Sequence, residues 1–599
     1  MCEGHVYLYI QSLLVSSPVF LRTDNAFSPT ASMSSPNVTP RPAATLILLR
    51  DASAGLEVLL AKRTHLANFA GGAYVFPGGA VDRADAAPEL AALASGIDDA
   101  EASKRLGIEK GGLGYWIAAI RECFEEAGLL FAHADDDELI DIDGHAGPRF
   151  ASARKALAAG EASLLHLLQS HDLRLAADRL HYFSHWITQA GRPRRYDTRF
   201  FLARAPDRQT PSHDGEELVN HIWIRPGDAL ERGSRGELNL MFPTLKTLES
   251  LSKLGDVAAA IEHARTLRVR PPMSPRAGIG RDGKRLLVPG DYAYAELGRL
   301  DPEHKGTASY EILPGVPVLL SERVTRLTAS NPGVMTGPGT NTYLIGDAAN
   351  GVAVIDPGPA DVEHVDTILE EAPGPIRWIL CTHTHVDHSP AAVLLKERTQ
   401  ARTYGMLAAH TERQDQTFVP DHEVAEGEIL ELAGVTLRVL HTPGHASNQV
   451  CYFLEEEHLL FTGDHIMQGS TVVINPPDGN MADYFASLER LYEEDIEWLA
   501  PGHGFLMEKP YEVVERLIVH RRNRENKVVN ALRDGGQGSV ETLVPIVYDD
   551  TPERMHRLAM RSLLAHLHKL EADGRAKQDQ EIWELIDAEE KISPSGDRV

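Results

Sequence analysis

Residues 377–388 read RWILCTHTHVDH, and this stretch decides the fold of the second half of the chain. Its first five residues predict a short, mostly apolar strand. Four side chains able to bind a metal then follow within six residues, namely His383, His385, Asp387 and His388. Because side chains alternate along an extended chain, His383 and His385 point to the same side. Imidazole and carboxylate groups are good zinc ligands, so the stretch predicts a metal site at a strand end.

Three later strands end in a similar way, with a glycine directly before a residue that can bind a metal. The sequences are TPGH at 442–445, TGD at 462–464 and PGH at 501–503, which add His445, Asp464 and His503. Glycine has no side chain, so the backbone can approach a site closely at these points. Seven candidate ligands in four ordered motifs therefore predict one shared metal centre.

In this order the motifs resemble those of the metallo-β-lactamase superfamily. The resemblance implies an αββα sandwich that binds two Zn²⁺ ions. It implies that one ion is held by His383, His385 and His445. The other ion would be held by Asp387, His388 and His503, with Asp464 bridging the two. All seven positions of the family pattern are filled in this chain.

Such a site implies a metal-dependent hydrolase. Bound zinc lowers the pKa of a water molecule to about 7, which gives hydroxide at neutral pH. We expect this zinc hydroxide to attack an ester, thioester, amide or phosphodiester. Asp387 or Asp464 would accept the proton of the water. Thioester hydrolysis of the glyoxalase type uses the same metal cage and remains open.

The C-terminal part leaves a nuclease function open as the alternative. The segments NPG at 331–333, GPGTNTYL at 337–344, VIDPG at 354–358 and HRRNRE at 520–525 resemble a lactamase-like group that includes a single-strand-specific endoribonuclease. The resemblance covers residues 317–590. Arg521 and Arg524, on a helix predicted to begin at Pro510, are candidates for binding the phosphates of single-stranded RNA or DNA. The competing interpretation of these arginines is a solvated helix face with local ion pairs.

The last part of the chain also carries its own fold pattern. Residues 510–532, 540–547 and 552–572 predict three helices, and residues 574–586 predict a short β-hairpin. Three helices followed by a hairpin indicate a small winged-helix-like cap.

The first half of the chain contains a second candidate site, at residues 115–128, which read YWIAAIRECFEEAG. The periodicity predicts an amphipathic helix that ends at Gly128. Glu122, Glu125 and Glu126 lie at i, i+3 and i+4, where three carboxylates repel one another unless cations are present. Hard oxygen ligands of this kind suit Mg²⁺ or Mn²⁺. Arg121 lies at the edge of this face and can pair with one of the carboxylates.

Residues 121–128 resemble the core of the Nudix box, R-E-x-x-E-E-x-G, and upstream Gly79 and Asp85 match its first part. Asp85 stands where the family has Glu, and the 35 residues between Asp85 and Arg121 form a large insertion. A similar insertion occurs in a Nudix subgroup related to coenzyme A diphosphatases. The resemblance implies an α/β/α sandwich that hydrolyses a pyrophosphate linkage, with Glu125 as a catalytic residue and Gly78, Gly79 and Arg121 in substrate binding.

Two features weaken or compete with that interpretation. Ala61 and Asn68 depart from the family's coenzyme A motif. The Nudix-like fold could also serve as a ligand sensor without catalysis.

Around the helix, residues 44–51 and 56–62 predict a β-hairpin, and Ala86–Ala102 predicts a further helix interrupted by Gly96.

The chain of 599 residues is long enough for three or four domains. We expect a multidomain α/β and α+β protein. The boundaries expected from composition are a disordered N-terminal extension at 1–40, a Nudix-like domain at 41–267, a connecting stretch at 268–316, a metallo-β-lactamase domain at 317–508, a winged-helix-like domain at 509–590 and a tail at 591–599. Met33 precedes the first strand, so residues 1–32 are either an extension beyond a natural start at Met33 or a genuine tail.

The composition limits which classes of substrate and binding partner we expect for this chain. The formal charge of −27 gives no global field for nucleic acid or an anionic membrane. We expect a small-molecule substrate, namely a nucleoside diphosphate derivative, a coenzyme A derivative or a thioester. No apolar run reaches the ~18 residues of a membrane span, and four cysteines are too few for a disulfide framework. We therefore expect a cytoplasmic protein with free thiols, and the sequence does not fix its oligomeric state.

Overall fold

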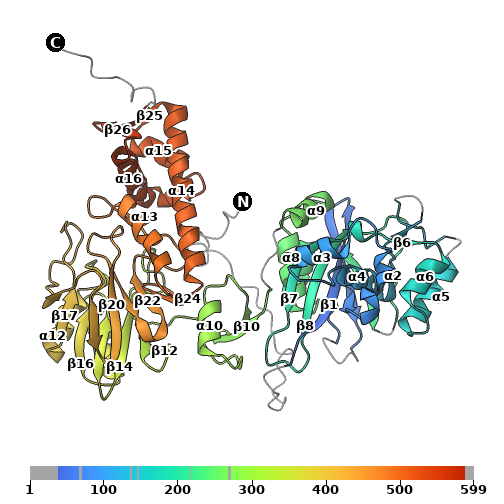
Figure 1. The fold of residues 1–599 in the computed structure, drawn as a ribbon, viewed down its shortest axis with the longest axis horizontal. Helices are drawn as coiled ribbons and strands as arrows, with labels where there is room; N and C mark the ends of the chain where they lie inside the picture. Colours follow the sequence, from blue (N-terminus) through green and yellow to red (C-terminus); the bar gives the residue numbers. More distant parts are fainter. Residues whose placement is uncertain are drawn as a thin grey trace, which may run out of the picture. The chain divides into compact units, whose positions relative to one another are not determined.

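The computed structural model describes residues 38–65, 71–134, 138–144, 147–215, 217–267 and 272–586. The described residues form two compact units, one of residues 38–277 with 303–305 and one of residues 278–302 with 306–586 (Figure 1). Most of the N-terminal extension expected at 1–40, including Met33, and the whole tail expected at 591–599 lie outside the described residues.

The first unit is built on a mixed sheet whose central strand is β1 (Arg41–Ala52). The predicted hairpin is confirmed, because β1 pairs antiparallel with β2 (Gly55–Arg63). On its other side β1 pairs parallel with β8 (Tyr196–Arg204). The remaining strands of this sheet are β3 (Tyr74–Val75), β4 (Gly78–Ala80), β7 (His181–Ile187) and β9 (Leu218–Ile224).

The helix predicted from residue 115 is α4 (Leu113–Ala127), and it ends at Gly128 with φ 70°, as expected for a left-handed C-cap. Its apolar face buries Trp116, Ile120 and Phe124 against β1 and β8. The single helix predicted at 86–102 is wrong. The chain instead forms α2 (Pro88–Ala91) and α3 (Asp99–Leu106), separated by Gly96 at φ 76°.

Further helices complete this unit: α5 (Gly147–Ala158), α6 (Leu164–Ser170), α7 (Pro226–Ser234), α8 (Phe242–Leu251) and α9 (Val257–Thr266). Of these, α7 contacts β2, and α9 contacts β1, β7 and β8. A small two-stranded sheet joins β5 (Ala132–His133) to β6 (Arg174–Leu175).

The second unit contains two facing sheets. One sheet consists, in this order, of β12 (Val318–Leu319), β13 (Val324–Thr328), β14 (Asn341–Asp347), β15 (Gly351–Ile355), β16 (Ile376–Leu380), β17 (Arg402–Gly405) and β18 (His422–Glu423). The other consists of β19 (Ile429–Leu432), β20 (Val435–His441), β21 (Val450–Leu454), β22 (Leu459–Gly463), β23 (Trp498–Pro501) and β24 (Met507–Glu508).

An apolar core lies between the two sheets, with Tyr343 and Ile345 from the first sheet against Val439, Tyr452 and Phe461 from the second. The outer face of the first sheet is covered by α11 (Val362–Glu371) and α12 (Ala391–Thr399). The outer face of the second is covered by α13 (Met481–Arg490) and the start of α14 (Pro510–Gly535). These four layers confirm the predicted αββα sandwich (Figure 1).

The stretch expected to connect the domains differs from the expectation. Residues 276–300 form β10 (Arg276–Gly280), β11 (Gly283–Leu287) and α10 (Tyr294–Leu300), and α10 packs on Phe505 of the sandwich. Glu296 of α10 is 1% exposed and binds Arg326 through two hydrogen bonds of 2.6 and 2.9 Å. Because a buried ion pair replaces apolar side chains here, hydropathy alone does not reveal that this segment belongs to the domain.

The expected winged-helix-like cap is present after residue 509. It consists of α14, α15 (Val540–Val547), α16 (His556–Ala572) and a small sheet of β25 (Gln537–Gly538), β26 (Ala576–Asp579) and β27 (Ile582–Leu585). Its core includes Val528, Leu563, Leu567 and Trp583.

Two further expectations concern the whole chain. Within the described ranges, no helix is both long and apolar enough to cross a bilayer. Cys123, Cys381 and Cys451 are buried free thiols, as predicted, and Cys2 lies outside the described residues.

Candidate metal centre

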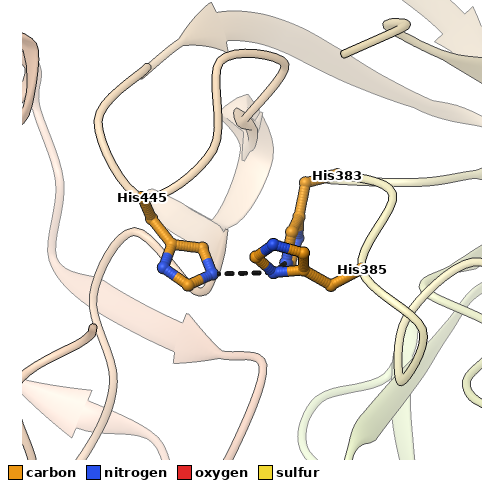
Figure 2. Close-up of side chains that lie close together, drawn as sticks. All are labelled: His383, His385 and His445. Atoms are coloured by element: carbon orange, nitrogen blue, oxygen red, sulfur yellow. Dashed lines mark hydrogen bonds between the residues drawn. The ribbon is translucent and has the colours of Figure 1, made fainter. Parts of the chain in front are cut away.

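The seven predicted ligands converge where four strands of the sandwich end. His383, His385, Asp387 and His388 lie in the turn after β16, in the first sheet. His445, Asp464 and His503 follow β20, β22 and β23, in the second sheet. Figure 2 shows His445 approaching His383 and His385 from a separate segment of the chain. The two sheets therefore contribute to one site.

The first group of donors consists of three imidazoles. His385 Nδ1 lies 2.9 Å from His383 Nε2 and 2.9 Å from His445 Nε2 (Figure 2). Burial and the neighbouring histidines lower the pKa of His383 well below its usual range. Burial also lowers the pKa of His445. Both rings are therefore neutral, the state in which imidazole nitrogen binds a metal.

The second group adds carboxylates. His503 Nε2 lies 3.5 Å from Asp387 Oδ2 and 3.3 Å from Asp464 Oδ1. His388 Nε2 lies 3.5 Å from Asp464 Oδ1, whereas Asp464 Oδ2 faces His445 Nε2 at 3.7 Å. Asp464 thus presents one oxygen to each group of donors.

The charges in this second group oppose the effect of burial. Burial disfavours a charge on Asp464, but the adjacent His503 and His388 hold its pKa well below the usual range. Burial also opposes protonation of His503, yet Asp464 and Asp387 raise its pKa to about 9. Asp387 and Asp464 therefore make this half of the site attractive to a cation.

Contacts outside the site orient the rings. His388 Nδ1 donates to Asp356 Oδ2 at 2.9 Å, His445 Nδ1 to the carbonyl of Val473 at 2.8 Å, and His503 Nδ1 to the carbonyl of Gly339 at 3.1 Å. These acceptors hold a proton on Nδ1, so Nε2 is the nitrogen that each ring presents to the site. Sequence reasoning missed Asp356, although it lies in the VIDPG segment.

Two glycines make this close approach possible. A Cβ on Gly502 would lie 2.8 Å from both Asp464 Oδ1 and His388 Cε1. A Cβ on Gly444, which has φ 139°, would lie 2.4 Å from Tyr484 Cα. Glycine directly before His445 and His503 is therefore needed for packing, as the sequence indicated.

The donor atoms fit a bound cation. His388 Nε2, His503 Nε2 and Asp464 Oδ1 are buried and have no hydrogen-bond partner among the described residues. An unsatisfied buried polar atom costs ~1–3 kcal/mol, so several at one point require a compensating ligand. The donor set falls into three groups whose ligand atoms lie within 4.8 Å of one another: His383, His385 and His445; His383, His388 and Asp464; and Asp387, His388 and His503.

The Nudix-like site is held together by Arg121. Its guanidinium binds Asp85 through hydrogen bonds of 2.9 and 3.0 Å, so the structure joins the two ends of the 35-residue insertion. It also binds Glu122 at 2.9 Å and Glu125 at 3.2 Å. The donors of this buried guanidinium bind groups inside the protein.

The glycines of β4 contact the carboxylates of α4. Gly78 N–H donates to Glu126 Oε2 at 2.8 Å, and a Cβ on Gly79 would lie 2.5 Å from the carboxylate carbon of Glu122. Burial raises the pKa of Glu122 to about 7, and it raises that of Glu126 well above its usual range. Among the described residues, Glu122, Glu125 and Glu126 do not bring three oxygens within 4.8 Å of one another.

A further residue of this site was missed by sequence reasoning. Arg154 of α5 donates from Nε to the carbonyl of Glu125 and from Nη2 to that of Glu126, both at 2.9 Å. It therefore caps the end of α4 that carries the carboxylates. Nothing in the local sequence around Arg154 indicates this contact. Asn68 of the coenzyme A motif lies outside the described residues.

Arg521 and Arg524, which the sequence offers as candidates for binding phosphates, have buried side chains. The two residues are 2% and 4% exposed. Arg521 donates to the carbonyl of Val472, and Arg524 binds Asp550 at 2.8 and 3.2 Å. Both side chains point into the protein, because the face of α14 that carries them packs against the rest of the fold.

Comparison with known proteins places these sites in families. A family model of the metallo-beta-lactamase superfamily matches residues 335–503. A model of the beta-lactamase associated winged helix domain matches residues 539–583, and a NUDT19 Nudix domain model matches residues 98–251.

Individual relatives match one half of the chain at a time. A beta-lactamase-like protein 2 homolog of Drosophila melanogaster is 31% identical over 44% of this chain and 93% of its own length. An atrochrysone carboxyl ACP thioesterase of Aspergillus chevalieri is 30% identical over 44% of this chain and 86% of its own. The crystal structure of a NUDIX hydrolase from Alicyclobacillus acidocaldarius is 27% identical, with 39% and 99% coverage and a TM-score of 0.31. The chain thus belongs to the metallo-beta-lactamase superfamily, as a hydrolase with a Nudix domain before the sandwich and a winged helix domain after it.

Proposed function

We propose that the sandwich binds two zinc ions and hydrolyses a thioester. The observation that carries this proposal is the set of buried donor atoms without partners, from His388, His503 and Asp464. Five imidazoles and two carboxylates form a donor set that suits zinc. The ligands would be His383, His385 and His445 for one ion and Asp387, His388 and His503 for the other, with Asp464 shared between them.

Two such cations, when bound, lower the pKa of a water molecule to about 7 and polarise the scissile carbonyl. The chain's own residues set up this chemistry. Asp356 and the carbonyls of Val473 and Gly339 keep three imidazoles in the tautomer that faces the site. The side chain of Asp387 is 25% exposed, against 10% for Asp464, so Asp387 is the better placed carboxylate to pass a proton to solvent.

Two arguments favour a thioester over the other substrates. The thiol released from a thioester has a pKa of ~8.5, so the sulfur leaves without a general acid to protonate it. One relative carries the name of an ACP thioesterase. The nuclease alternative drew on a family resemblance and on Arg521 and Arg524, and the burial of these two arginines removes the second support.

The proposal is tested by metal analysis and a substrate panel. We expect two zinc ions per chain and cleavage of acyl thioesters by the full chain. Asp464→Ala should lose both metal ions and activity, whereas Glu370→Gln, an exposed change on α11, should keep both. Cleavage of single-stranded RNA with no thioester turnover would overturn the substrate assignment, and absence of bound metal after gentle purification would overturn the centre itself.

We further propose that the Nudix domain hydrolyses a pyrophosphate linkage in a nucleoside diphosphate derivative, with Mg²⁺ or Mn²⁺. Support comes from the contacts of Gly78 and Gly79 with the carboxylates of α4 and from the Asp85–Arg121 pair that fixes this helix. Glu122, Glu125 and Glu126 would hold the cations, and Glu125 would act as the base.

The Nudix activity can be measured separately from the sandwich. The full chain carrying Asp464→Ala should still release a nucleoside monophosphate from a dinucleotide pyrophosphate when Mn²⁺ is added. Glu125→Gln should lower that rate by about 10²–10⁴-fold, the contribution of general-base catalysis. Glu109→Gln, an exposed change in the same unit, serves as the control. A domain that binds the nucleotide without cleaving it would support the ligand-sensor interpretation instead.

A further inference from the structure

The loop between β22 and α13 connects the metal centre to the winged helix domain. Three consecutive residues of this loop each make one polar contact. The carbonyl of Val472 accepts from Arg521 of α14, and the carbonyl of Val473 accepts from His445 Nδ1 at 2.8 Å. The N–H of Ile474 donates to Ser562 Oγ of α16 at 3.4 Å. The peptide group that orients a metal ligand therefore lies between two contacts to the C-terminal helices.

Arg521 supports His445 from a second direction as well. Its guanidinium lies over the ring of Tyr484, 5.4 Å from the ring centroid. The backbone of Tyr484 packs so closely on Gly444 that a Cβ there would not fit. The Tyr484 hydroxyl donates to the carbonyl of His465 at 3.1 Å. Arg521 thus contacts both the residue that packs beside His445 and the loop that binds its ring.

The environment of Arg521 is unusual for an arginine. It is 2% exposed, and in the described part of the chain it forms no ion pair with a carboxylate. Its Nε also has no hydrogen-bond partner there. Burying a cation without a carboxylate partner is costly. A carbonyl acceptor and an aromatic ring compensate only part of this cost, which indicates that the buried position of Arg521 has a function.

We propose that Arg521 is a positioning residue for the metal centre, which holds His445 in the orientation needed to bind the first metal ion. The winged helix domain then contributes to the metal centre by positioning one of its ligands. The proposal rests on metal binding at the seven ligands and does not depend on the identity of the substrate.

Metal affinity tests this role directly. Loss of a residue that orients a metal ligand through one intermediate contact typically costs 10–100-fold in metal affinity. In Arg521→Met we expect the affinity for one of the two ions to fall by about 10–100-fold. The decrease in kcat should be larger than the change in KM. Arg521→Lys, which keeps one donor for the Val472 carbonyl, should restore part of the affinity. Arg516→Met, an exposed change on the same helix, is the matched control.

A Co²⁺-substituted protein separates positioning from general destabilisation. The visible spectrum of cobalt in the three-histidine position should change in Arg521→Met, and that of cobalt at the carboxylate-rich position should not. If Arg521→Met does not fold, Ser562→Ala serves in its place. It removes only the contact to Ile474 and should weaken metal binding by a few-fold. Unchanged affinity and spectra in a folded Arg521→Met or in Ser562→Ala would overturn the proposal.

Discussion

Asp356→Asn tests how far the metal centre depends on contacts behind its ligands. Asp356 is 2% exposed, and its two oxygens are fully used. Oδ1 accepts the N–H of Thr382 at 2.7 Å. Oδ2 accepts both the Thr382 hydroxyl at 2.8 Å and His388 Nδ1 at 2.9 Å. Its φ of 50° is a conformation that asparagine tolerates, so the substitution should not disturb the backbone.

The asparagine amide creates a conflict in either orientation. If its NH₂ group faces His388, two donors meet, and the imidazole must move its proton from Nδ1 to Nε2. That proton then occupies the lone pair intended for the metal. If the amide is reversed, its NH₂ group meets the N–H of Thr382 instead. The expected cost is 10–100-fold in affinity for the ion held by His388, or about 1.4–2.8 kcal/mol.

Competition with a chromophoric zinc chelator measures both affinities. We expect the weaker binding to be confined to the ion bound by His388, with two ions still bound at saturating zinc. Asp483→Asn, an exposed change on α13, is the control for the substitution itself. If Asp356→Asn binds both ions as tightly as the wild type, the orientation of His388 does not depend on this carboxylate.

Three further predictions concern stability. Arg326→Met leaves Glu296 buried without its partner and should destabilise the sandwich by about 3–5 kcal/mol in urea unfolding, whereas the exposed Arg323→Met should change little. The double variant Arg326→Met/Glu296→Leu should unfold at a higher urea concentration than Arg326→Met alone. An equal or lower concentration would show that the unpaired charge of Glu296 is not the cause of the destabilisation. Burial opposes ionisation of Glu525, but His566 and Lys569 lower its pKa to about 2, below the usual 4.5. Its stabilisation of the winged helix domain should therefore be complete above pH 4.5 and disappear as the pH falls toward 2. Urea titrations of wild type and Glu525→Gln should accordingly differ at pH 7 and converge near pH 2, and an equal difference at both pH values would refute the pairing. Removal of the metal ions by a chelator should lower the melting temperature of the sandwich, because a ligand present at 100 times its Kd stabilises the folded state by ~2.7 kcal/mol. Scanning calorimetry with and without zinc measures this shift, and an unchanged melting temperature would mean that the site binds no metal in solution.

The sequence was sufficient where a function depends on residues close together in the chain. The ligands after β16 follow an apolar strand directly, so their position at a strand end could be predicted from 12 residues. The helix that carries Glu122 and Glu125 has both a clear periodicity and a glycine stop. Both features depend on local spacing, which a single sequence contains.

Features that depend on distant partners could not be predicted. Whether Arg521 faces solvent or the interior depends on the loop at Val472, which is 49 residues away. The segment of Glu296 resembles a linker because Arg326, which pairs with its buried charge, lies 30 residues away in the sequence. Gly96 was visible in the sequence, but the strength of its effect on the helix required the positive φ that the fold imposes.

The division of the ligands between the two sheets has a consequence for how the protein acquires metal. A nascent chain that has only reached residue 388 already holds four donors, but the other three join them only when the layers close. If cations bind as proposed, the complete ligand set therefore forms only when the two sheets pack together. A substitution that shifts one sheet relative to the other, even far from the ligands, would therefore lower the metal affinity.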